Sequence, residues 1–225
     1  MTKNVVIVAG GKGLRTGYKL PKQFIPIGGK PVLMHTIEAF YNYNAAIRII
    51  VVLSESYINY WQQICSDYNF GISHLVTVGG ETRFHSVKNG LALTSPGLIA
   101  IHDAARPFVS PKLITQTFED ANIYKAVIPV IDATDSLREI AADGSNKIID
   151  RSKIKLVQTP QVFDSELLKS AYNTTYTDTF TDDASVVEAQ GEKIFLTKGE
   201  ITNIKITTSF DLEIAETILK SSDCP

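Results

Sequence analysis

Short apolar runs recur along the chain and are separated by longer segments with a helical pattern. The runs cover residues 5–9, 49–53, 75–78, 98–101 and 126–130. They are largely apolar throughout instead of alternating, which is typical of parallel strands buried on both faces. The segments between them are long enough to hold crossover helices. We therefore expect an α/β domain with three layers, in which helices cover both faces of a mostly parallel sheet.

Three helix starts can be read from capping residues. Ser110 precedes Pro111, which combines an N-cap serine with a proline in the first turn. Asp164 and Thr208 stand where N-caps should precede two further helical segments, at 167–171 and 212–219. We expect one helix to begin after each of these three capping residues.

The alternation of strand and helix fails between residues 132 and 155. This stretch is polar, and Asp143-Gly144 is a typical hairpin turn between short β-like segments at 136–140 and 147–149. We interpret it as a β-arm that projects from the body of the protein. No repeat or linker divides the rest, so we expect residues 1–225 to form a single domain with 132–155 as its arm.

Composition and charge narrow the class of protein. The chain has 225 residues, 44% of them hydrophobic, and its 22 Lys and Arg against 24 Asp and Glu leave a net charge of −2. Such a balance offers no general attraction for nucleic acid or anionic membranes, so we expect neither as a partner. Any anionic ligand must be held by local cations. No secretory signal or membrane-spanning run is visible, which predicts a cytoplasmic protein.

A glycine-rich loop follows the first expected strand and predicts a phosphate-binding site. The backbone NH groups around Gly10, Gly11 and Gly13 can approach a polyphosphate closely. The spacing fits neither the Walker A motif nor the dinucleotide fingerprint, whose third glycine is missing. Arg15 and Lys22 add two cations that suit a triphosphate attacked at its α-phosphorus. Taken alone, the segment could also be a solvated basic loop, although a phosphate site is favoured.

Seven separated motifs then follow one another in a recognisable order. They are Ala9-Gly10-Gly11-Lys12-Gly13-x-Arg15 with Pro21-Lys22-Gln23, Gly79-Gly80 before Arg83 and Ser86, Ile101-His102-Asp103-Ala104-Ala105-Arg106-Pro107, Asp150-Arg151, Thr159-Pro160-Gln161, Thr181-Asp182-Asp183-Ala184-Ser185, and Asn203-Ile204-Lys205. From residue 5 to about residue 220 the chain resembles the 2-C-methyl-D-erythritol 4-phosphate cytidylyltransferases of the non-mevalonate isoprenoid pathway. The resemblance implies a Rossmann-like nucleotidyltransferase domain. It also implies transfer of a cytidylyl group from CTP to methylerythritol phosphate, with pyrophosphate as product and Mg²⁺ as cofactor.

The resemblance further implies roles for individual residues. Arg15 and Lys22 would stabilise the transition state, whereas Arg151 and Lys205 would position the acceptor phosphate. The nucleotide would be bound by Ala9, Gly10, Gly11, Gly13, Gly80, Glu81, Ser86, Asp103 and Ala104. The acceptor would be bound by Arg106, Ser136, Thr159 and Thr181. Asp103 would also hold the metal ion.

Physical arguments agree with several of these roles. Asp103 follows the expected strand at 98–101, and open α/β sheets bind ligands beside the carboxyl ends of their strands. A carboxylate there can hold Mg²⁺ against phosphates, although a helix N-cap is the alternative for this aspartate. The fork of Arg106 matches a phosphate monoester, and His102 is expected to be a buried neighbour of the site. Because a phosphate monoester is already largely dianionic at pH 7, the reaction needs cations and no general base.

The resemblance also implies a homodimer with interlocked arms, in which Arg151 and an arm hydroxyl enter the partner's site. Here the sequence departs from the family's Pro-Val-x-Asp-Thr, because it reads Pro129-Val130-Ile131-Asp132-Ala133-Thr134-Asp135-Ser136. Aligning Asp135-Ser136 with the family's Asp-Thr makes Ser136 the arm hydroxyl, and Thr134 is the alternative.

Two other functions stay open at this point. A pentitol phosphate cytidylyltransferase, such as the ribitol 5-phosphate enzyme, shares several motifs, but Ala104-Ala105 and residues 181–185 favour methylerythritol phosphate. A non-catalytic nucleotide-binding module on the same fold is the second alternative. The intact cations Arg15, Lys22 and Lys205 argue against it, since a pure binder needs no cations aimed at the α-phosphate.

Overall fold

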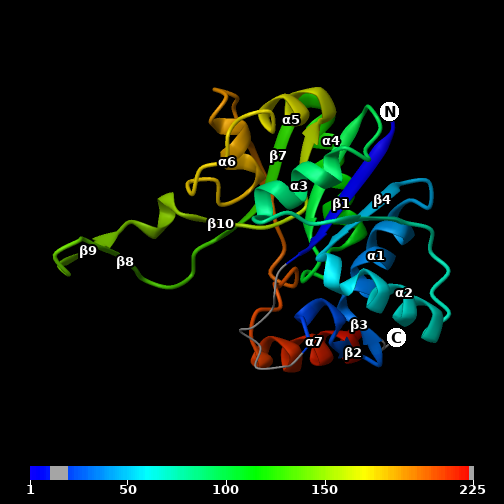
Figure 1. The fold of residues 1–225 in the computed structure, drawn as a ribbon. Helices are drawn as coiled ribbons and strands as arrows, with labels where there is room; N and C mark the ends of the chain where they lie inside the picture. Colours follow the sequence, from blue (N-terminus) through cyan, green and yellow to red (C-terminus); the bar gives the residue numbers. More distant parts are fainter. Residues whose placement is uncertain (11–19, 223–225) are drawn as a thin grey trace.

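The computed structural model describes residues 1–10 and 20–222, and its centre is one large sheet (Figure 1). The strands of this sheet are β1 (Lys3–Ala9), β4 (Arg48–Leu53), β5 (Leu75–Val78), β6 (Leu98–Asp103), β7 (Ala126–Asp132), β10 (Lys155–Val157), β11 (Gln161–Asp164) and β12 (Phe195–Lys198). The helices are α1 (Val32–Tyr43), α2 (Ile58–Asp67), α3 (Arg83–Leu91), α4 (Pro111–Tyr124), α5 (Ser165–Ala171), α6 (Asp183–Glu188) and α7 (Ser209–Ser222). Three short 3₁₀ helices are described, η2 (Lys22–Phe24), η3 (Glu55–Tyr57) and η4 (Arg151–Lys153). Two small hairpins lie outside the large sheet. One pairs β2 (Pro26–Ile27) with β3 (Lys30–Pro31), and the other pairs β8 (Leu137–Ile140) with β9 (Asn146–Ile149).

The sheet is mostly parallel, as the apolar runs predicted. Its strands follow the order β10-β7-β11-β6-β1-β4-β5, and β12 also pairs with β7. The pairs of β1 with β4 and β6, of β4 with β5, and of β12 with β7 are parallel, whereas β11 runs antiparallel between β6 and β7. All five expected strands are present, and most extend a residue or two beyond the predicted ends.

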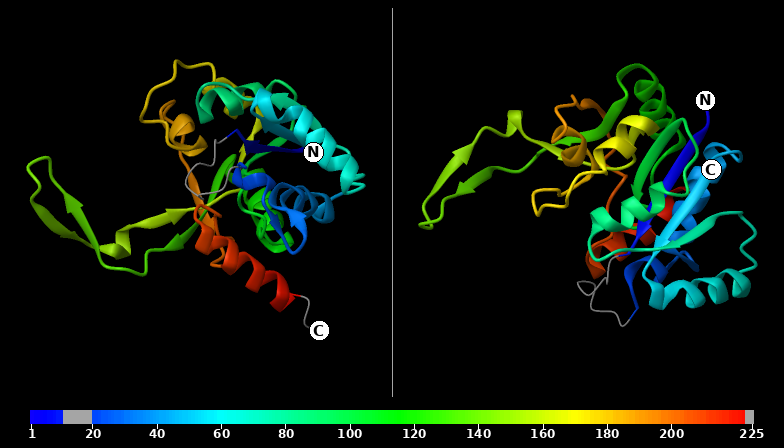
Figure 2. Two further views of the ribbon diagram at one scale, coloured as in Figure 1. Left: turned by 60° about the horizontal axis from the view of Figure 1, so that its bottom comes forward. Right: turned by 45° about the horizontal axis from the view of Figure 1, so that its top comes forward.

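Helices cover both faces of the sheet, which confirms the three-layer architecture (Figures 1 and 2). Val5 and Ile7 of β1 belong to a core cluster with buried side chains of α1, α2 and α4. Their neighbour Val6 belongs to a second cluster with buried side chains of α3, α5 and α6. Because successive side chains of a strand point to opposite faces, one apolar strand supplies both cores.

Strand β5 differs from the prediction of burial on both faces. It forms the end of the sheet beyond β4, and its side chains Leu75 and Val78 are 38% and 40% exposed. An edge strand has a neighbour on one side only, so an apolar run there stays partly open to solvent.

The three predicted helix starts are confirmed. The Ser110 hydroxyl accepts a hydrogen bond from the amide of Leu113 at 3.0 Å, at the start of α4. Asp164 accepts from the first amides of α5, and the Thr208 hydroxyl accepts from the Asp211 amide at 3.3 Å as α7 begins. These side chains satisfy amide groups that have no partner inside the helix.

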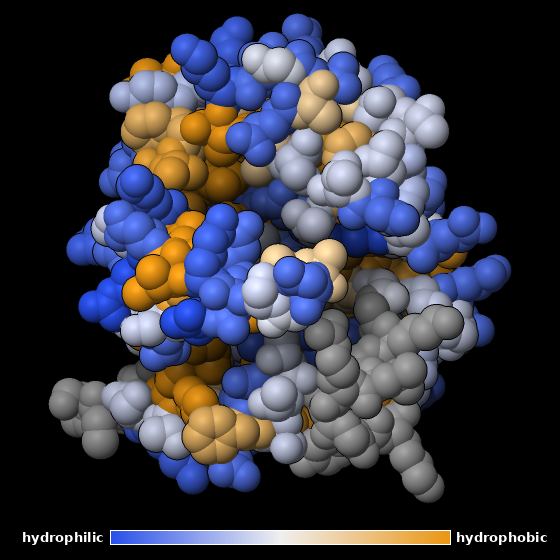
Figure 3. Space-filling view, turned by 90° about the vertical axis from the view of Figure 1, so that its left-hand side faces the viewer, coloured by the Kyte–Doolittle hydropathy of each residue, from blue (hydrophilic) through white to orange (hydrophobic). Residues whose placement is uncertain are grey.

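The predicted arm is also present, as the hairpin of β8 and β9. Leu137 pairs with Ile149, and the turn between the strands contains Gly144 at φ +82°. In all three ribbon views the hairpin projects away from the sheet and its helices (Figures 1 and 2). Figure 3 looks onto the side from which it projects, where apolar surface lies between hydrophilic residues. No helix within the described ranges is both long and apolar enough to cross a membrane.

Helix α7 joins two segments that lie far apart in the sequence. Its buried residues Leu212 and Ala215 pack with Ile27 of β2 and with Ile206, which follows the motif Asn203-Ile204-Lys205. The amide of Gly28 also donates to the Glu216 carboxylate at 2.8 Å. The C-terminal helix therefore holds the segment after Lys22 close to the segment around Lys205.

Gly90 brings helix α3 into close contact with the sheet. A Cβ atom there would lie 2.5 Å from Val6 Cγ1 and 3.0 Å from Val52 Cγ2. Gly90→Ala should therefore lower the free energy of unfolding by about 1–2 kcal/mol, because overpacking outweighs the gain in helix propensity. Chemical denaturation measures this change. Gly71→Ala is the control, since its Cβ would meet no atom within 4 Å, and a Gly90→Ala protein as stable as that control would contradict the prediction.

Candidate active site

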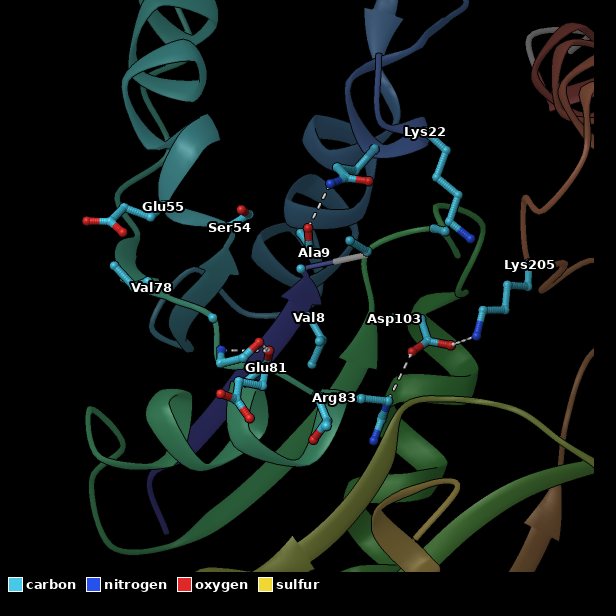
Figure 4. A pocket seen from close by; sticks show the side chains of 18 of the residues that line it. Val8, Ala9, Lys22, Ser54, Glu55, Val78, Glu81, Arg83, Asp103 and Lys205 are labelled. Atoms are coloured by element: carbon cyan, nitrogen blue, oxygen red, sulfur yellow. Dashed lines mark hydrogen bonds and ion pairs between the residues drawn. The ribbon is translucent and has the colours of Figure 1, made fainter. Parts of the chain in front are cut away.

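Two neighbouring cavities open at the carboxyl edge of the parallel strands. The larger has a volume of about 950 Å³ and is bordered by the ends of β1, β5 and β6 and by the turn that precedes α3. The smaller, of about 260 Å³, lies beside the start of β11 and the segment before α6. Arg83, Asp103 and Lys205 line both cavities. These three side chains therefore form the boundary between the two spaces, and Figure 4 shows them in the larger cavity.

Asp103, the last residue of β6, lies among three cations. Its Oδ2 atom is 2.7 Å from the Lys205 ammonium, while the Nε atoms of Arg83 and Arg106 each lie 3.8 Å from one of its oxygens. Burial alone would raise the pKa of this carboxyl, but Arg83 and Lys205 hold that pKa well below its usual range. Asp103 is therefore ionised at neutral pH. It caps no helix, because α4 begins only at Pro111.

His102 is a buried neighbour of the site, as predicted. Its Nε2 lies 3.0 Å from the Arg106 carbonyl oxygen, and its Nδ1 lies 3.0 Å from the Thr159 hydroxyl. The same hydroxyl accepts a hydrogen bond from the Asp103 amide at 3.1 Å. Desolvation by burial lowers the pKa of His102 to about 4. A neutral imidazole whose Nε2–H donates to the Arg106 carbonyl, and whose Nδ1 accepts from the Thr159 hydroxyl, satisfies both contacts. His102 therefore links the backbone at Arg106 to the Thr159 side chain.

Arg106 does not present the open fork that its motif predicts. Its Nη1 donates to the Asn203 carbonyl at 2.7 Å, and its Nη2 donates to the Val157 carbonyl at 3.5 Å. The buried Nε has no hydrogen-bond partner among the described residues. Two N–H groups of the guanidinium are therefore occupied by the backbone carbonyls of Asn203 and Val157. An anion in the smaller cavity would meet the remaining N–H groups.

A buried charge network behind Asp103 was not foreseen as part of the site. The Arg83 guanidinium reaches from α3 to Asp183, with Nη2 2.6 Å from Oδ2. The other oxygen of Asp183 accepts a hydrogen bond from the Tyr172 hydroxyl at 2.6 Å. Burial alone would lower the pKa of Arg83, but the Asp183 carboxylate raises it. Arg83 and Asp183 both stood in the motifs, yet their spacing of a hundred residues hid the pairing.

Asp182, which precedes Asp183, has a different role. Its carboxylate accepts from the Ser185 amide as the N-cap of α6 and from the Gln161 side chain at 2.8 Å. Local patterns did not distinguish the capping aspartate from the buried one.

Glycines bring two backbone segments close to one hydroxyl on the wall of the larger cavity. The buried Ser86 hydroxyl accepts a hydrogen bond from the Gly80 amide at 3.1 Å. A Cβ atom at Gly79 would lie 3.0 Å from that oxygen, and one at Gly10 would lie 3.3 Å from it. The predicted nucleotide ligands Gly10, Gly80 and Ser86 are therefore adjacent in space, and Ala9, Glu81 and Ala104 line the same cavity.

Gln23 fixes the position of the predicted catalytic lysine. Its buried side chain donates to the Ala9 carbonyl at 2.7 Å, which ties η2 to the end of β1. Lys22, the first residue of η2, consequently lines the larger cavity (Figure 4). Gly11, Gly13 and Arg15, the other loop residues of the prediction, lie outside the described residues.

The remaining predicted residues fall into two groups. Thr181 lines the smaller cavity, as does Thr159. Arg151 and Ser136 lie on the arm and are absent from the described lining of both cavities. The Arg151 guanidinium donates instead to the carbonyl of Thr134. Within one chain, the structure therefore does not bring the arm residues to the site.

A mostly parallel sheet with two cavities at its carboxyl edge, separated by cations around one carboxylate, is an arrangement suited to enzymes that join two anionic substrates, such as nucleotidyltransferases. The family model described as 2-C-methyl-D-erythritol 4-phosphate cytidylyltransferase (IspD) matches residues 4–221. A Bacteroides thetaiotaomicron protein of that name is 55% identical, over 97% of this chain and 100% of its own length. One from Clostridium novyi is 36% identical, over 98% of both chains.

Solved structures give the same result. The 4-diphosphocytidyl-2C-methyl-D-erythritol synthase of Anaerococcus prevotii superposes with a TM-score of 0.83 at 29% identity, covering 97% of this chain and 96% of that one. The 2-C-methyl-D-erythritol 4-phosphate cytidylyltransferase of Thermus thermophilus superposes with a TM-score of 0.78 at 31% identity, covering 98% and 100%. The chain belongs to the 2-C-methyl-D-erythritol 4-phosphate cytidylyltransferase family.

The low pKa of His102 makes stability depend on pH. Between pH 6.5 and about 4 the unfolded histidine binds a proton and the folded one does not, so the free energy of unfolding falls as the pH falls. His102→Gln should show a shallower slope than the wild type in this window. Urea unfolding across the window measures both slopes, and equal slopes would mean that the folded imidazole is protonated at its ordinary pKa.

Proposed function

We propose that this protein transfers the cytidylyl group of CTP to 2-C-methyl-D-erythritol 4-phosphate and releases pyrophosphate. The observation that carries the proposal is the pair of adjoining cavities with a common boundary of Arg83, Asp103 and Lys205. A reaction that joins two anions needs two binding sites that meet at positive charge. The larger cavity would take CTP, and the smaller one the sugar-alcohol phosphate.

The larger cavity suits a pyrimidine nucleotide. At one end, the turn of Gly79 and Gly80 around Ser86 offers backbone groups at close range to a planar base. Lys22 lies on the opposite wall (Figure 4), and in the sequence it follows the glycine-rich loop that would hold the triphosphate. The α-phosphorus would then stand between these two ends, near Asp103 and Lys205.

The chemistry requires cations more than it requires proton transfer. The acceptor phosphate is dianionic near neutral pH and attacks the α-phosphorus in line, while pyrophosphate leaves on the opposite side. Lys22 would stabilise the charge that builds on the α-phosphate oxygens, together with Arg15 from the glycine loop. Lys205 and Arg106 would orient the acceptor phosphate in the smaller cavity. His102, neutral and fully hydrogen-bonded, would have no part in proton transfer.

A magnesium ion fits this site only together with the nucleotide. Mg²⁺ is commonly bound by one or two carboxylates and by substrate phosphates. Asp103 is ionised and stands at the boundary of the cavities, whereas the described residues contain no cluster of three or more His, Cys, Asp or Glu side chains that could hold an ion. Asp103 would be its protein ligand. When bound, the ion would neutralise charge on the triphosphate and on the leaving pyrophosphate.

We further propose that two chains form the working unit through their arms. The β8–β9 hairpin carries the exposed apolar side chains Ile140 and Ile148, which are 67% and 73% exposed. A hairpin of two strands is marginally stable by itself, so these side chains favour a second chain as their cover. Arg151 would then act in the partner's site, with Ser136 or Thr134 as the arm hydroxyl. A cytoplasmic location stays a prediction from sequence.

The substrate assignment is tested by measuring pyrophosphate release from CTP and Mg²⁺ with one acceptor at a time. We expect turnover with methylerythritol phosphate and at least about 100-fold less with ribitol 5-phosphate, because binding energy for the correct acceptor is expressed in turnover. The opposite preference would assign the chain to the pentitol phosphate alternative. CTP binding without turnover on either acceptor would support a non-catalytic module.

The arm assignment is tested by mixing two inactive variants. Lys22→Ala and Arg151→Ala homodimers should each be inactive, and subunit exchange should restore about a quarter of the wild-type rate, since half of the dimers then contain one intact site. Arg151→Ala mixed with wild type, in the same ratio, controls for simple dilution. If activity stays absent after exchange has been demonstrated by mass spectrometry, Arg151 serves its own chain's site.

A further inference from the structure

Arg83 occupies an electrostatically unfavourable position in the chain. It is the first residue of α3, and no acidic residue stands in the first turn of that helix. The N-terminus of a helix carries partial positive charge, so a cation there is disfavoured unless other groups compensate for it. The compensating groups must come from elsewhere in the fold.

Two carboxylates from distant segments supply this compensation. The Arg83 Nη2 atom lies 2.6 Å from Asp183 at the start of α6, and its Nε atom lies 3.8 Å from Asp103 at the end of β6. The two contacts differ in strength, because the first is a short charge-assisted hydrogen bond and the second is a longer-range attraction. The guanidinium is therefore fixed to Asp183 and only faces Asp103.

The Asp183 side chain is itself rigidly held. It is completely buried, and each of its oxygens has one partner, the Tyr172 hydroxyl on Oδ1 and Arg83 on Oδ2. Tyr172 is 2% exposed, and its ring stacks on Phe84 with a centroid separation of 4.7 Å. A buried carboxylate with both oxygens paired has no low-cost alternative position. Tyr172 and Asp183 thus form a fixed anchor for Arg83.

The cations around Asp103 differ in their freedom to move. The Lys205 side chain is 43% exposed and ends in a flexible ammonium, whereas 30% of Arg83 is exposed and its guanidinium is tied to the anchor. Polyanionic substrates that fill the two cavities will attract the freer cation first. If Lys205 turns toward a substrate phosphate, Arg83 and Arg106, whose Nε atoms each lie 3.8 Å from an Asp103 oxygen, remain beside the carboxylate.

We propose that Arg83 is a positioning residue for the transfer reaction, and that the buried pair Tyr172–Asp183 keeps its guanidinium at a fixed distance from Asp103. The anchor has two effects. It keeps a positive charge beside Asp103 during the reaction, and it prevents the guanidinium from closing a bidentate fork over both Asp103 oxygens. The Asp103 oxygens thereby continue to face the two cavities in which the substrates would bind. This inference rests on the proposed transferase function.

Tyr172→Phe tests the anchor with the smallest possible change. It removes the hydroxyl that holds Asp183 and keeps the ring that stacks on Phe84. Tyr176→Phe is the matched control, because this tyrosine also contacts the Phe84 ring but donates its hydroxyl to the exposed Asp178. For each protein, steady-state kinetics of pyrophosphate release give kcat and both KM values, and thermal unfolding gives Tm.

We expect Tyr172→Phe to lower kcat about five- to tenfold with both KM values within about twofold, and Tyr176→Phe to match the wild type. A fall in Tm with unchanged kcat would overturn the proposal, because it would make the anchor a purely structural feature. A rise in KM without a change in kcat would overturn it as well. Wild-type turnover, measured in the same assay, tests the transferase function separately.

A second comparison asks whether the anchor acts through Arg83. In an Arg83→Gln background, Tyr172→Phe should lower kcat no further, because the anchor then has no guanidinium to hold. An undiminished five- to tenfold effect in that background would overturn the proposal. Should Arg83→Gln fail to fold, the double variant Arg83→Gln with Asp183→Asn replaces the ion pair by two amides and serves as the background. Arg83→Lys, which keeps the charge but loses the fork, should fall between wild type and Arg83→Gln in kcat.

Discussion

The attraction between the Asp103 carboxylate and the cations around it is the interaction on which this structure depends. Two anionic substrates must meet at one point. If the site contained cations alone, their mutual repulsion would destabilise it in the absence of substrates. A single carboxylate at the end of β6 keeps Lys205, Arg83 and Arg106 together at distances of 2.7 to 3.8 Å. The parallel sheet brings this carboxylate to the edge where the cavities open.

These cations reach Asp103 from different parts of the chain, and the two arginines are held by different partners. Arg83 comes from α3 and is held by the buried Asp183. Arg106 is held by the carbonyl of Asn203, in the segment that leads to Lys205 and α7. The neutral His102 links the backbone carbonyl of Arg106 to the Thr159 hydroxyl, and it adds no charge to the site. A slightly negative chain can therefore maintain a concentrated positive site, because burial and pairing fix where each charge stands.

The same constraint explains the division between rigid and exposed parts of the molecule. The groups that set the geometry, such as Asp183, His102 and Gln23, are buried and hydrogen-bonded. The groups proposed to meet substrate, such as Lys205 and Thr181, are more exposed and line the cavities. The residues named as setting the geometry thus differ from those named as meeting substrate. Substrates can therefore bind without breaking the buried hydrogen bonds that hold the site in shape.

The sequence by itself determined the features that depend on neighbouring residues. These include the five apolar strands, the caps at Ser110 and Asp164, the turn at Asp143-Gly144, and the motifs that point to the site. Only the tertiary structure decided that β5 lies at an edge, that two N–H groups of Arg106 are spent on carbonyls, and that Arg83 pairs with Asp183. Strand and cap signals arise within a few residues and leave a local pattern. A contact across a hundred residues leaves none, because it exists only after the sheet has brought both segments together.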